Sequence, residues 1–126
     1  MTVDRDQLLE IERGFWTGDS SYFAENADRE CLVAFPEMVG VLDNADLAAT
    51  ASKPKRWRNL EMKLKGIVEP GSDIVVLSYE AMAVRQDGEP YAALVSTGYV
   101  RRLQGWKMMF HAQTPIVEQS RKAARS

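Results

Sequence analysis

The sequence predicts an α+β fold in which helices of the first half cover one face of an antiparallel sheet formed by the second half. Apolar residues recur at helical spacing from Asp4 to about Thr17, and the last helical pattern ends before Pro54. After Pro54, long apolar and β-branched runs alternate with tight-turn sequences, and no helical pattern returns before the tail. Helices followed by a meander of strands are typical of the α+β class.

Length and composition predict one compact domain. The chain has 126 residues, of which 45% are hydrophobic and 27% are charged, a balance typical of a domain with its own core. We expect a single domain over residues 1–126, with a folded core at about 4–116 and a tail at 117–126. The basic cluster at 121–125 falls in that tail and is interpreted as a frayed terminus.

Charge and hydropathy argue against nucleic-acid and membrane partners. The 16 Lys and Arg residues nearly balance the 18 Asp and Glu residues, the formal net charge is -2, and neither sign forms a long block. No apolar run approaches the ~20 residues that span a bilayer. The N-terminus also lacks the pattern of a secretory signal. We therefore expect a cytoplasmic protein with no nucleic-acid partner and no membrane partner.

Cysteine and histidine are too scarce for a disulfide or a metal site. Cys31 is the only cysteine, which excludes an internal disulfide and fits a reducing compartment. It lies in the apolar run 31–35 without a nearby base, so a buried structural thiol is favoured over a nucleophile. The single histidine is far away in the chain, and glycine-rich phosphate loops are absent. We expect no metal and no cofactor.

The first helix is expected from Asp4 to about Thr17. Leu8, Ile11 and Phe15 recur on one face at helical spacing, while polar residues turn outward. Gly18 is expected to end this helix in the left-handed conformation.

Two shorter helices are expected on either side of a strand. Asp19 or Ser20 can cap a short second helix, and the chain then becomes extended from 28 to 35, where Pro36 closes the strand. Asp43 is expected to be the N-cap of the third helix.

Four strands are expected in the second half, separated by turn signals. The strands are 57–68, 74–85, 91–102 and 106–114, and the turns are 70–72, 87–88 and 104–105. Successive tight turns connect neighbouring strands as hairpins, so these strands form an antiparallel meander.

Alternation along the strands sorts their side chains into two faces. Tight turns would place Lys63 opposite Glu80, Tyr79 opposite Ser96 and Thr97 near His111. The polar face then carries Lys63, Ser78, Glu80, Thr97, His111 and Gln113. The apolar face, expected under the helices, carries Leu60, Met62, Leu77, Tyr79, Ala81, Leu94, Ser96, Trp106, Met108, Phe110 and Ala112. A one-residue slip in any pair would reverse that strand.

The polar face also carries large apolar residues, which is typical of a contact surface. These residues are Trp57, Val76, Met82, Val95, Tyr99 and Met109. We predict a homodimer through this open face of the sheet, because twofold pairing is the commonest assembly of a small domain. The predicted interface consists of Trp57, Glu80, Thr97, Tyr99, His111 and Gln113. The alternative is the ordinary scatter of apolar residues on a protein surface.

Several segments together resemble the nuclear transport factor 2-like superfamily, in particular its SnoaL-like bacterial members. They are the first helix with Trp16-Thr17-Gly18-Asp19, the short aromatic helix, the strand Leu32-Val33-Ala34-Phe35-Pro36, the capped third helix, and the closing Gly105-Trp106-Lys107 and His111-Ala112-Gln113-Thr114-Pro115. The resemblance covers about Leu8 to Pro115. It implies a cystatin-like cone of curved sheet and helices around an apolar cavity, with dimers through the sheet.

The superfamily includes enzymes, and ketosteroid isomerase resembles this chain in the first helix, the Gly-Asp break and the strand-Pro turn. Its oxyanion-hole tyrosine corresponds by spacing to Ile11, and its general-base aspartate corresponds to Phe35. Neither group is present, so proton transfer of that type is not supported. The Asp-Arg-Asp set of the epoxide hydrolases that share the cone finds no match either.

The cone implied by the resemblance would be lined by aromatic and flexible apolar groups with one Tyr-Ser polar pair. The predicted ligand-pocket residues are Trp16, Phe35, Met62, Tyr79, Ser96, Trp106, Met108 and Phe110. Such a wall suits an apolar small molecule held by one or two hydrogen bonds. The alternative is that these side chains fill the cone completely, because protein interiors pack densely.

No catalytic residue is assigned, and His111 is the best candidate. Imidazole titrates near neutral pH, and Glu80 on the neighbouring strand could orient it. The face assignment, however, puts both side chains outside the cavity, which favours a structural or interface histidine. A strand bulge that turned His111 inward would reverse this preference.

We therefore predict a dimeric domain that binds an apolar small molecule and has no assignable reaction. One alternative is an acid–base enzyme, an isomerase, cyclase or dehydratase of the SnoaL-like type, that uses His111, Tyr79 or Glu80. Another alternative is an assembly module whose function lies in the sheet surface.

Overall fold

The computed structural model describes residues 4–51 and 57–116, so the predicted tail at 117–126 lies outside the described residues. Within these ranges the chain forms three helices and six strands of one sheet, which confirms the predicted α+β class. The helices are α1 (Arg5–Thr17), α2 (Ser20–Asn26) and α3 (Asn44–Ala49). The strands are β1 (Ala27–Phe35), β2 (Met38–Asp43), β3 (Arg58–Gly71), β4 (Ile74–Val84), β5 (Pro90–Arg102) and β6 (Gly105–Pro115).

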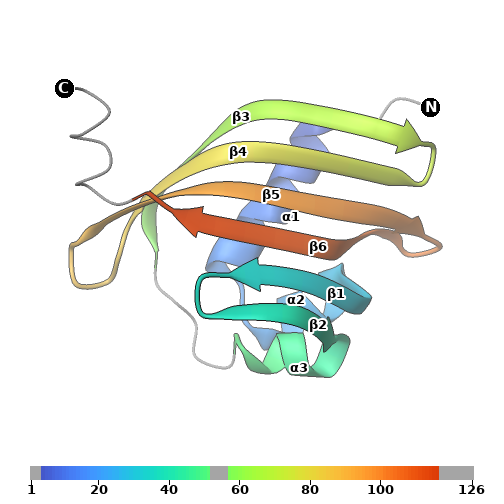
Figure 1. The fold of residues 1–126 in the computed structure, drawn as a ribbon, viewed down its shortest axis with the longest axis horizontal. Coiled ribbons are helices and arrows are strands. Elements are labelled where there is room, and N and C mark those ends of the chain that lie inside the picture. Colours follow the sequence, from blue (N-terminus) through green and yellow to red (C-terminus); the bar gives the residue numbers. More distant parts are fainter. Residues whose placement is uncertain (1–3, 52–56, 117–126) are drawn as a thin grey trace.

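The strands are arranged in the order β2-β1-β6-β5-β4-β3 (Figure 1). β3 to β6 form the antiparallel meander that the turn sequences predict. β1 runs parallel to β6, with Val33 opposite His111, so the sheet is mixed and the prediction of a wholly antiparallel sheet is wrong here. β2 pairs antiparallel with β1. Sequence alternation does not reveal β2, because its apolar residues Met38, Val39 and Val41 are exposed and do not alternate with polar residues.

The helices occupy two places on the sheet. In Figure 1, α1 crosses the sheet behind β3 to β6, whereas α2 and α3 lie together near β1 and β2. Each helix begins at an aspartate whose Oδ1 accepts a backbone N–H of the first turn: Asp4, Asp19 and Asp43. The predicted caps of α2 and α3 are thereby confirmed, with Asp19 as the residue that caps α2. No helix of the described residues is long and apolar enough to cross a membrane.

Gly18 ends α1 for a reason other than the predicted left-handed conformation. Its φ of -84° and ψ of 169° are extended, so that prediction is wrong. Tyr22 of α2 folds back against α1, and its hydroxyl donates to the carbonyl of Ile11 at 2.6 Å. A Cβ on Gly18 would lie 2.6 Å from the carbonyl oxygen of Gly14, and a Cβ on Gly14 would lie 2.1 Å from the Tyr22 ring. Both glycines therefore make room for this close junction.

The register of the hairpin between β4 and β5 differs from the predicted one. It closes at Val84 opposite Pro90, so its loop is longer than the expected two-residue turn at 87–88. Tyr79 consequently lies opposite Val95, one residue away from its expected partner. Because side chains alternate along a strand, this one-residue shift exchanges the two faces of β5.

A bulge in β6 is a second departure from the predicted pairing, and it changes which side chains of β6 face inward. Met108 lies opposite Tyr99, but the next pair is Phe110 opposite Gly98, so one extra residue of β6 is accommodated between them. After such an irregularity the alternation changes its phase. His111 therefore lies on the same side of the sheet as Met108, facing α1, instead of on the outer face.

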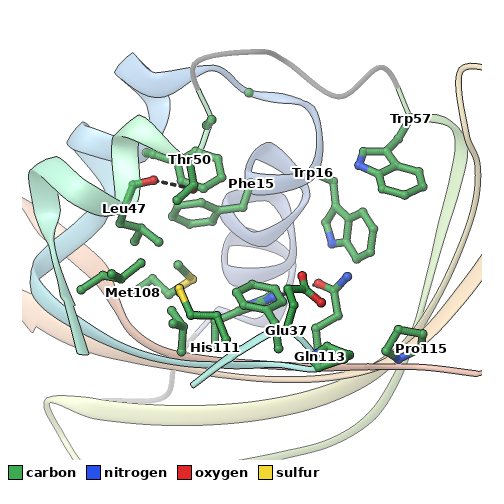
Figure 2. A pocket seen from close by; sticks show the side chains of 18 of the residues that line it. Phe15, Trp16, Glu37, Leu47, Thr50, Trp57, Met108, His111, Gln113 and Pro115 are labelled. Atoms are coloured by element: carbon green, nitrogen blue, oxygen red, sulfur yellow. Dashed lines mark hydrogen bonds between the residues drawn. The ribbon is translucent and has the colours of Figure 1, made fainter. Parts of the chain in front are cut away.

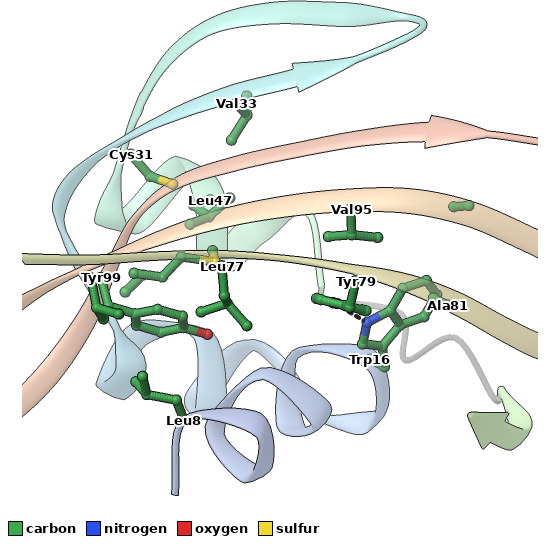
Figure 3. Packing of buried hydrophobic residues seen from close by; sticks show 14 residues of the cluster. Leu8, Trp16, Cys31, Val33, Leu47, Leu77, Tyr79, Ala81, Val95 and Tyr99 are labelled. Carbon is green, nitrogen blue, oxygen red and sulfur yellow. Dashed lines mark hydrogen bonds between the residues drawn. The ribbon is translucent and has the colours of Figure 1, made fainter. Parts of the chain in front are cut away.

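The inner face of the sheet packs against α1 to form the core. Figure 3 shows Leu8 and Trp16 of α1 on the side of the sheet to which Leu77, Tyr79 and Tyr99 point. The cluster also contains Cys31, Val33, Leu47, Val75, Ala81, Val95 and Met108, all buried. Burial of each large apolar side chain contributes about 1.5–3 kcal/mol, so this cluster fixes the position of α1 on the sheet.

The outer face of the meander is mixed in character. Lys63 lies opposite Glu80 as predicted. The hydroxyl oxygens of Ser78 and Ser96 are 2.7 Å apart on this face. Leu94 is 53% exposed, so the outer face keeps an apolar contribution.

Candidate functional site

The most unusual residue of the interior is Glu12, a fully buried carboxylate in the middle of α1. The hydroxyl of Tyr79 donates to its Oε2 at 2.5 Å, and the hydroxyl of Tyr99 donates to its Oε1 at 2.5 Å. The indole N–H of Trp16 donates to the Tyr79 hydroxyl at 2.9 Å. Carboxylates are buried only when hydrogen bonds or charges compensate them, and these phenols provide that compensation.

The two phenols are held as hydrogen-bond donors. Burial, and then the nearby Glu12 carboxylate, raise the pKa of Tyr79 far above the ordinary value for tyrosine. The same two causes raise the pKa of Tyr99. Both hydroxyls therefore keep their protons at any pH near neutrality, and both can donate to Glu12 continuously.

His111 joins this cluster to a second set of polar groups. Its Nδ1 lies 3.7 Å from Oε2 of Glu12, a contact that is an ion pair only when the imidazole is protonated. Its Nε2 lies 3.1 Å from Oε1 of Gln113, and Gln113 donates to the hydroxyl of Tyr91 at 2.6 Å. The ring packs against Phe35, with 5.5 Å between the ring centroids. A polar line thus runs from the buried carboxylate to Tyr91.

His111 and Gln113 open onto a pocket between the inner face of the sheet, α1 and the β1–β2 hairpin (Figure 2). Its volume is about 520 Å³, within the range of small-molecule sites. The apolar side chains of the wall include Phe15, Trp16, Phe23, Phe35, Leu42, Leu47, Trp57 and Met108. The polar and charged side chains are Glu37, Thr50, Arg85, Tyr91, His111 and Gln113.

Three of the eight predicted ligand-pocket residues line this pocket, namely Trp16, Phe35 and Met108. Tyr79 is in the core behind Trp16, bound to Glu12. Met62 and Trp106 pack against the core cluster and do not line the pocket.

The remaining two predicted pocket residues lie on the wrong face. Ser96 lies between Val95 and Thr97, which are both buried under α1, and therefore points outward with Ser78. Phe110 precedes the inward-facing His111 and points away from the pocket. The β5 register and the β6 bulge account for these two errors.

The structure places most of the predicted dimer-interface residues away from the outer face of the sheet. The pairing of Thr97 with His111 is confirmed, but both residues are buried on the inner face, as are Tyr99 and its hydrogen bond to Glu12. Gln113 and Trp57 line the pocket. Of the predicted interface set, Glu80 alone faces outward with Lys63. Glu80 therefore cannot orient His111, and Glu12 occupies that place instead.

Glu12 is the residue of the candidate site that sequence reasoning missed. Its signal was its position: Leu8, Glu12 and Trp16 follow one another at a spacing of four, so the carboxylate falls on the buried stripe of α1. A charged residue on such a stripe indicates a buried polar partner. Tyr91 and Arg85, which line the pocket, carried no comparable signal.

Cys31 is buried and does not line the pocket. Burial, followed by the charges of Glu12 and Asp28, raises the pKa of the Cys31 thiol to about 12, which keeps it protonated and unreactive. Among the described residues, no group of three His, Cys, Asp or Glu side chains is arranged to hold a metal ion.

The fold as a whole has counterparts among solved structures. An NTF2-like protein of unknown function from Prochlorococcus marinus matches with a TM-score of 0.72 and 16% sequence identity, over 94% of this chain and 98% of that chain. This chain has the NTF2-like fold. The expectation drawn from the loose sequence resemblance is confirmed at the level of fold.

Two further matches have different descriptions. A ketosteroid isomerase-like protein from Erwinia carotovora atroseptica has a TM-score of 0.68 and 12% identity, over 87% of this chain and 91% of that chain. The CaMKII hub homology domain of Chlamydomonas reinhardtii also has a TM-score of 0.68, with 14% identity, over 89% of this chain and 95% of that chain. No protein-family model and no curated protein matches the sequence. The NTF2-like fold therefore leaves the activity to be argued from the site.

Proposed function

We propose that the chain is a homodimeric small-molecule-binding domain whose ligand has an apolar body and one polar group. The pocket of about 520 Å³ carries this proposal, because its walls are mainly aromatic and aliphatic and three of its polar side chains are joined in one hydrogen-bonded line. Pockets with this composition bind ligands by burying apolar surface and fix their orientation through a few hydrogen bonds. His111, Gln113 and Tyr91 supply those hydrogen bonds here.

The cone and the dimer belong to the same proposal. α1 and the inner face of the sheet form the body of the cone, and the pocket is its open end. The outer face of the sheet would contact the second subunit, supported by the exposed Leu94 and Ile74 and by the Lys63–Glu80 pair. The match to a domain described as a hub is consistent with assembly of this fold.

Native mass spectrometry of freshly purified protein tests both parts at once. We expect a species of two 14.2 kDa chains, accompanied by additional mass from a bound small molecule. A species of one chain at micromolar concentration would contradict the dimer.

A matched pair of variants tests the pocket with 2-naphthol as the probe, measured by equilibrium dialysis. Met38 lines the pocket, whereas the neighbouring Val39 does not line it and is 74% exposed. We expect Met38→Trp to weaken binding about tenfold or more by filling the pocket, and Val39→Trp to leave it unchanged. Failure of the parent to bind 2-naphthol, or equal binding by both variants, would refute the pocket as the binding site.

The position of His111 favours a second candidate, an acid–base enzyme. The imidazole reaches the pocket wall, and Oε2 of Glu12 lies 3.7 Å from its Nδ1, outside hydrogen-bond distance but close enough to stabilise a protonated imidazole during proton transfer. Tyr79 supports this role only indirectly, because it is bound to Glu12 in the core. Glu80, on the opposite face of the sheet, takes no part.

Proton exchange on a simple ketone tests this candidate. In deuterated buffer, the enzyme proposal predicts that the protein accelerates exchange of the α-protons of 1-tetralone, followed by NMR. His111→Gln should remove at least about 99% of that acceleration, the usual scale of a general base, without a change in melting temperature. Exchange at the buffer rate with the parent protein would leave binding as the function of the pocket.

A further inference from the structure

The strongest unassigned feature of the pocket is Arg85, the first residue after β4. Its guanidinium carbon lies 4.8 Å from the centroid of the Tyr91 ring and 5.6 Å from that of Trp57. These two rings are themselves 4.9 Å apart, and Trp57 also packs against Trp16. The aromatic group therefore holds the guanidinium in a defined place at the pocket.

The positive charge of Arg85 has no acidic partner within the described part of the chain. The Asp28–Arg102 ion pair and the Glu12–His111 contact are the oppositely charged pairings found there, and neither involves Arg85. Arg85 is also the only lysine or arginine that lines the pocket among those residues. Its side chain is exposed, so an anion bound to it would remain partly hydrated and would avoid most of the cost of burying a charge.

We infer that the pocket takes an apolar carboxylic acid, with the carboxylate on Arg85 and the apolar body between the aromatic walls. A guanidinium presents a planar fork of N–H donors that matches the two oxygens of a carboxylate. The carboxylate would lie next to the Tyr91 ring, at the end of the polar line that begins at His111. Glu37, which also lines the pocket, disfavours a doubly charged head group such as a phosphate monoester. This inference rests on the proposed binding function and adds the chemical class of the ligand.

The test compares 2-naphthoate with 2-naphthol, which share the same two-ring body. Equilibrium dialysis at low salt should show that the parent protein binds 2-naphthoate about tenfold more tightly than 2-naphthol, the difference expected of one charge-assisted contact. Arg85→Gln should abolish that preference while the affinity for 2-naphthol stays the same. Added sodium chloride should weaken 2-naphthoate binding by the parent and leave 2-naphthol binding unaffected.

Arg101→Gln is the matched control. Arg101 also lies over an aromatic ring, 4.7 Å from the centroid of Trp106, but does not line the pocket, so this variant should keep the preference for 2-naphthoate. Equal binding of the two probes by the parent, or an unchanged preference in Arg85→Gln, would overturn the carboxylate inference and leave the pocket intact. Binding of neither probe would refute the binding function itself.

Discussion

We expect the substitution Glu12→Ala to lower the free energy of unfolding by about 3–5 kcal/mol, the usual cost of breaking a buried, hydrogen-bonded charge cluster. The carboxylate is fully buried and accepts hydrogen bonds from Tyr79 and Tyr99. Its removal leaves two buried phenols without an acceptor, and each unsatisfied donor costs about 1–3 kcal/mol. Urea unfolding followed by tryptophan fluorescence and circular dichroism measures the loss.

Two further variants distinguish the contribution of the Glu12 cluster to stability from the general effect of a substitution on α1. Glu12→Gln keeps the shape and one acceptor oxygen, so we expect it to lose about half as much stability as the alanine variant. Glu10 lies two residues before Glu12 on α1 and is exposed. The free energy of unfolding of Glu10→Ala should therefore stay within about 0.5 kcal/mol of the parent value. Equal stability of Glu12→Ala and Glu10→Ala would show that the cluster does not stabilise the fold.

The second large effect is expected for Gly18→Ala, with a loss of about 2 kcal/mol. At this extended φ and ψ, alanine would ordinarily stabilise the protein by about 0.4–1 kcal/mol, because it restricts the unfolded chain. Here the new methyl group would lie 2.6 Å from the carbonyl oxygen of Gly14 and 2.8 Å from Cβ of Tyr22. Steric overlap of this kind typically costs about 1–3 kcal/mol and involves backbone that cannot rotate away, so it outweighs the gain.

Gly66→Ala is the control for Gly18→Ala. A Cβ on Gly66 meets nothing within 4 Å, and its φ is not in the left-handed region, so we expect its stability to equal or slightly exceed that of the parent. Thermal unfolding by calorimetry should rank Gly66→Ala above Gly18→Ala. The reverse order would mean that the α1–α2 junction relaxes without cost.

Local signals in the sequence were sufficient for most of the fold. The aspartate caps of α2 and α3 and the meander were predicted correctly, because caps and turns depend on a few neighbouring residues. β2 and the parallel pairing of β1 with β6 were not predicted. Both depend on contacts between distant segments, which alternation within one strand cannot reveal.

The candidate site was harder to predict, because it depends on two departures from regular geometry. The longer loop before β5 exchanges the faces of that strand and brings Thr97 to the inner face. The bulge in β6 changes the alternation after Met108, so that His111 faces inward as well. Glu12 could have been found, since its spacing from Leu8 and Trp16 places a carboxylate on the buried stripe of α1. Arg85 could not have been found from the sequence, because no sequence pattern indicates that its guanidinium lies over the rings of Tyr91 and Trp57.

The parallel pair of β1 and β6 has a consequence for the order of assembly. β6 is the last strand among the described residues, and Val33 on β1 finds its place opposite His111 only after the whole meander has been synthesised. Contacts between such distant segments form late, because closing the intervening loop costs entropy before any contact repays it. We therefore expect a growing chain to acquire its hairpins early and to become competent for a ligand only as its final strand docks.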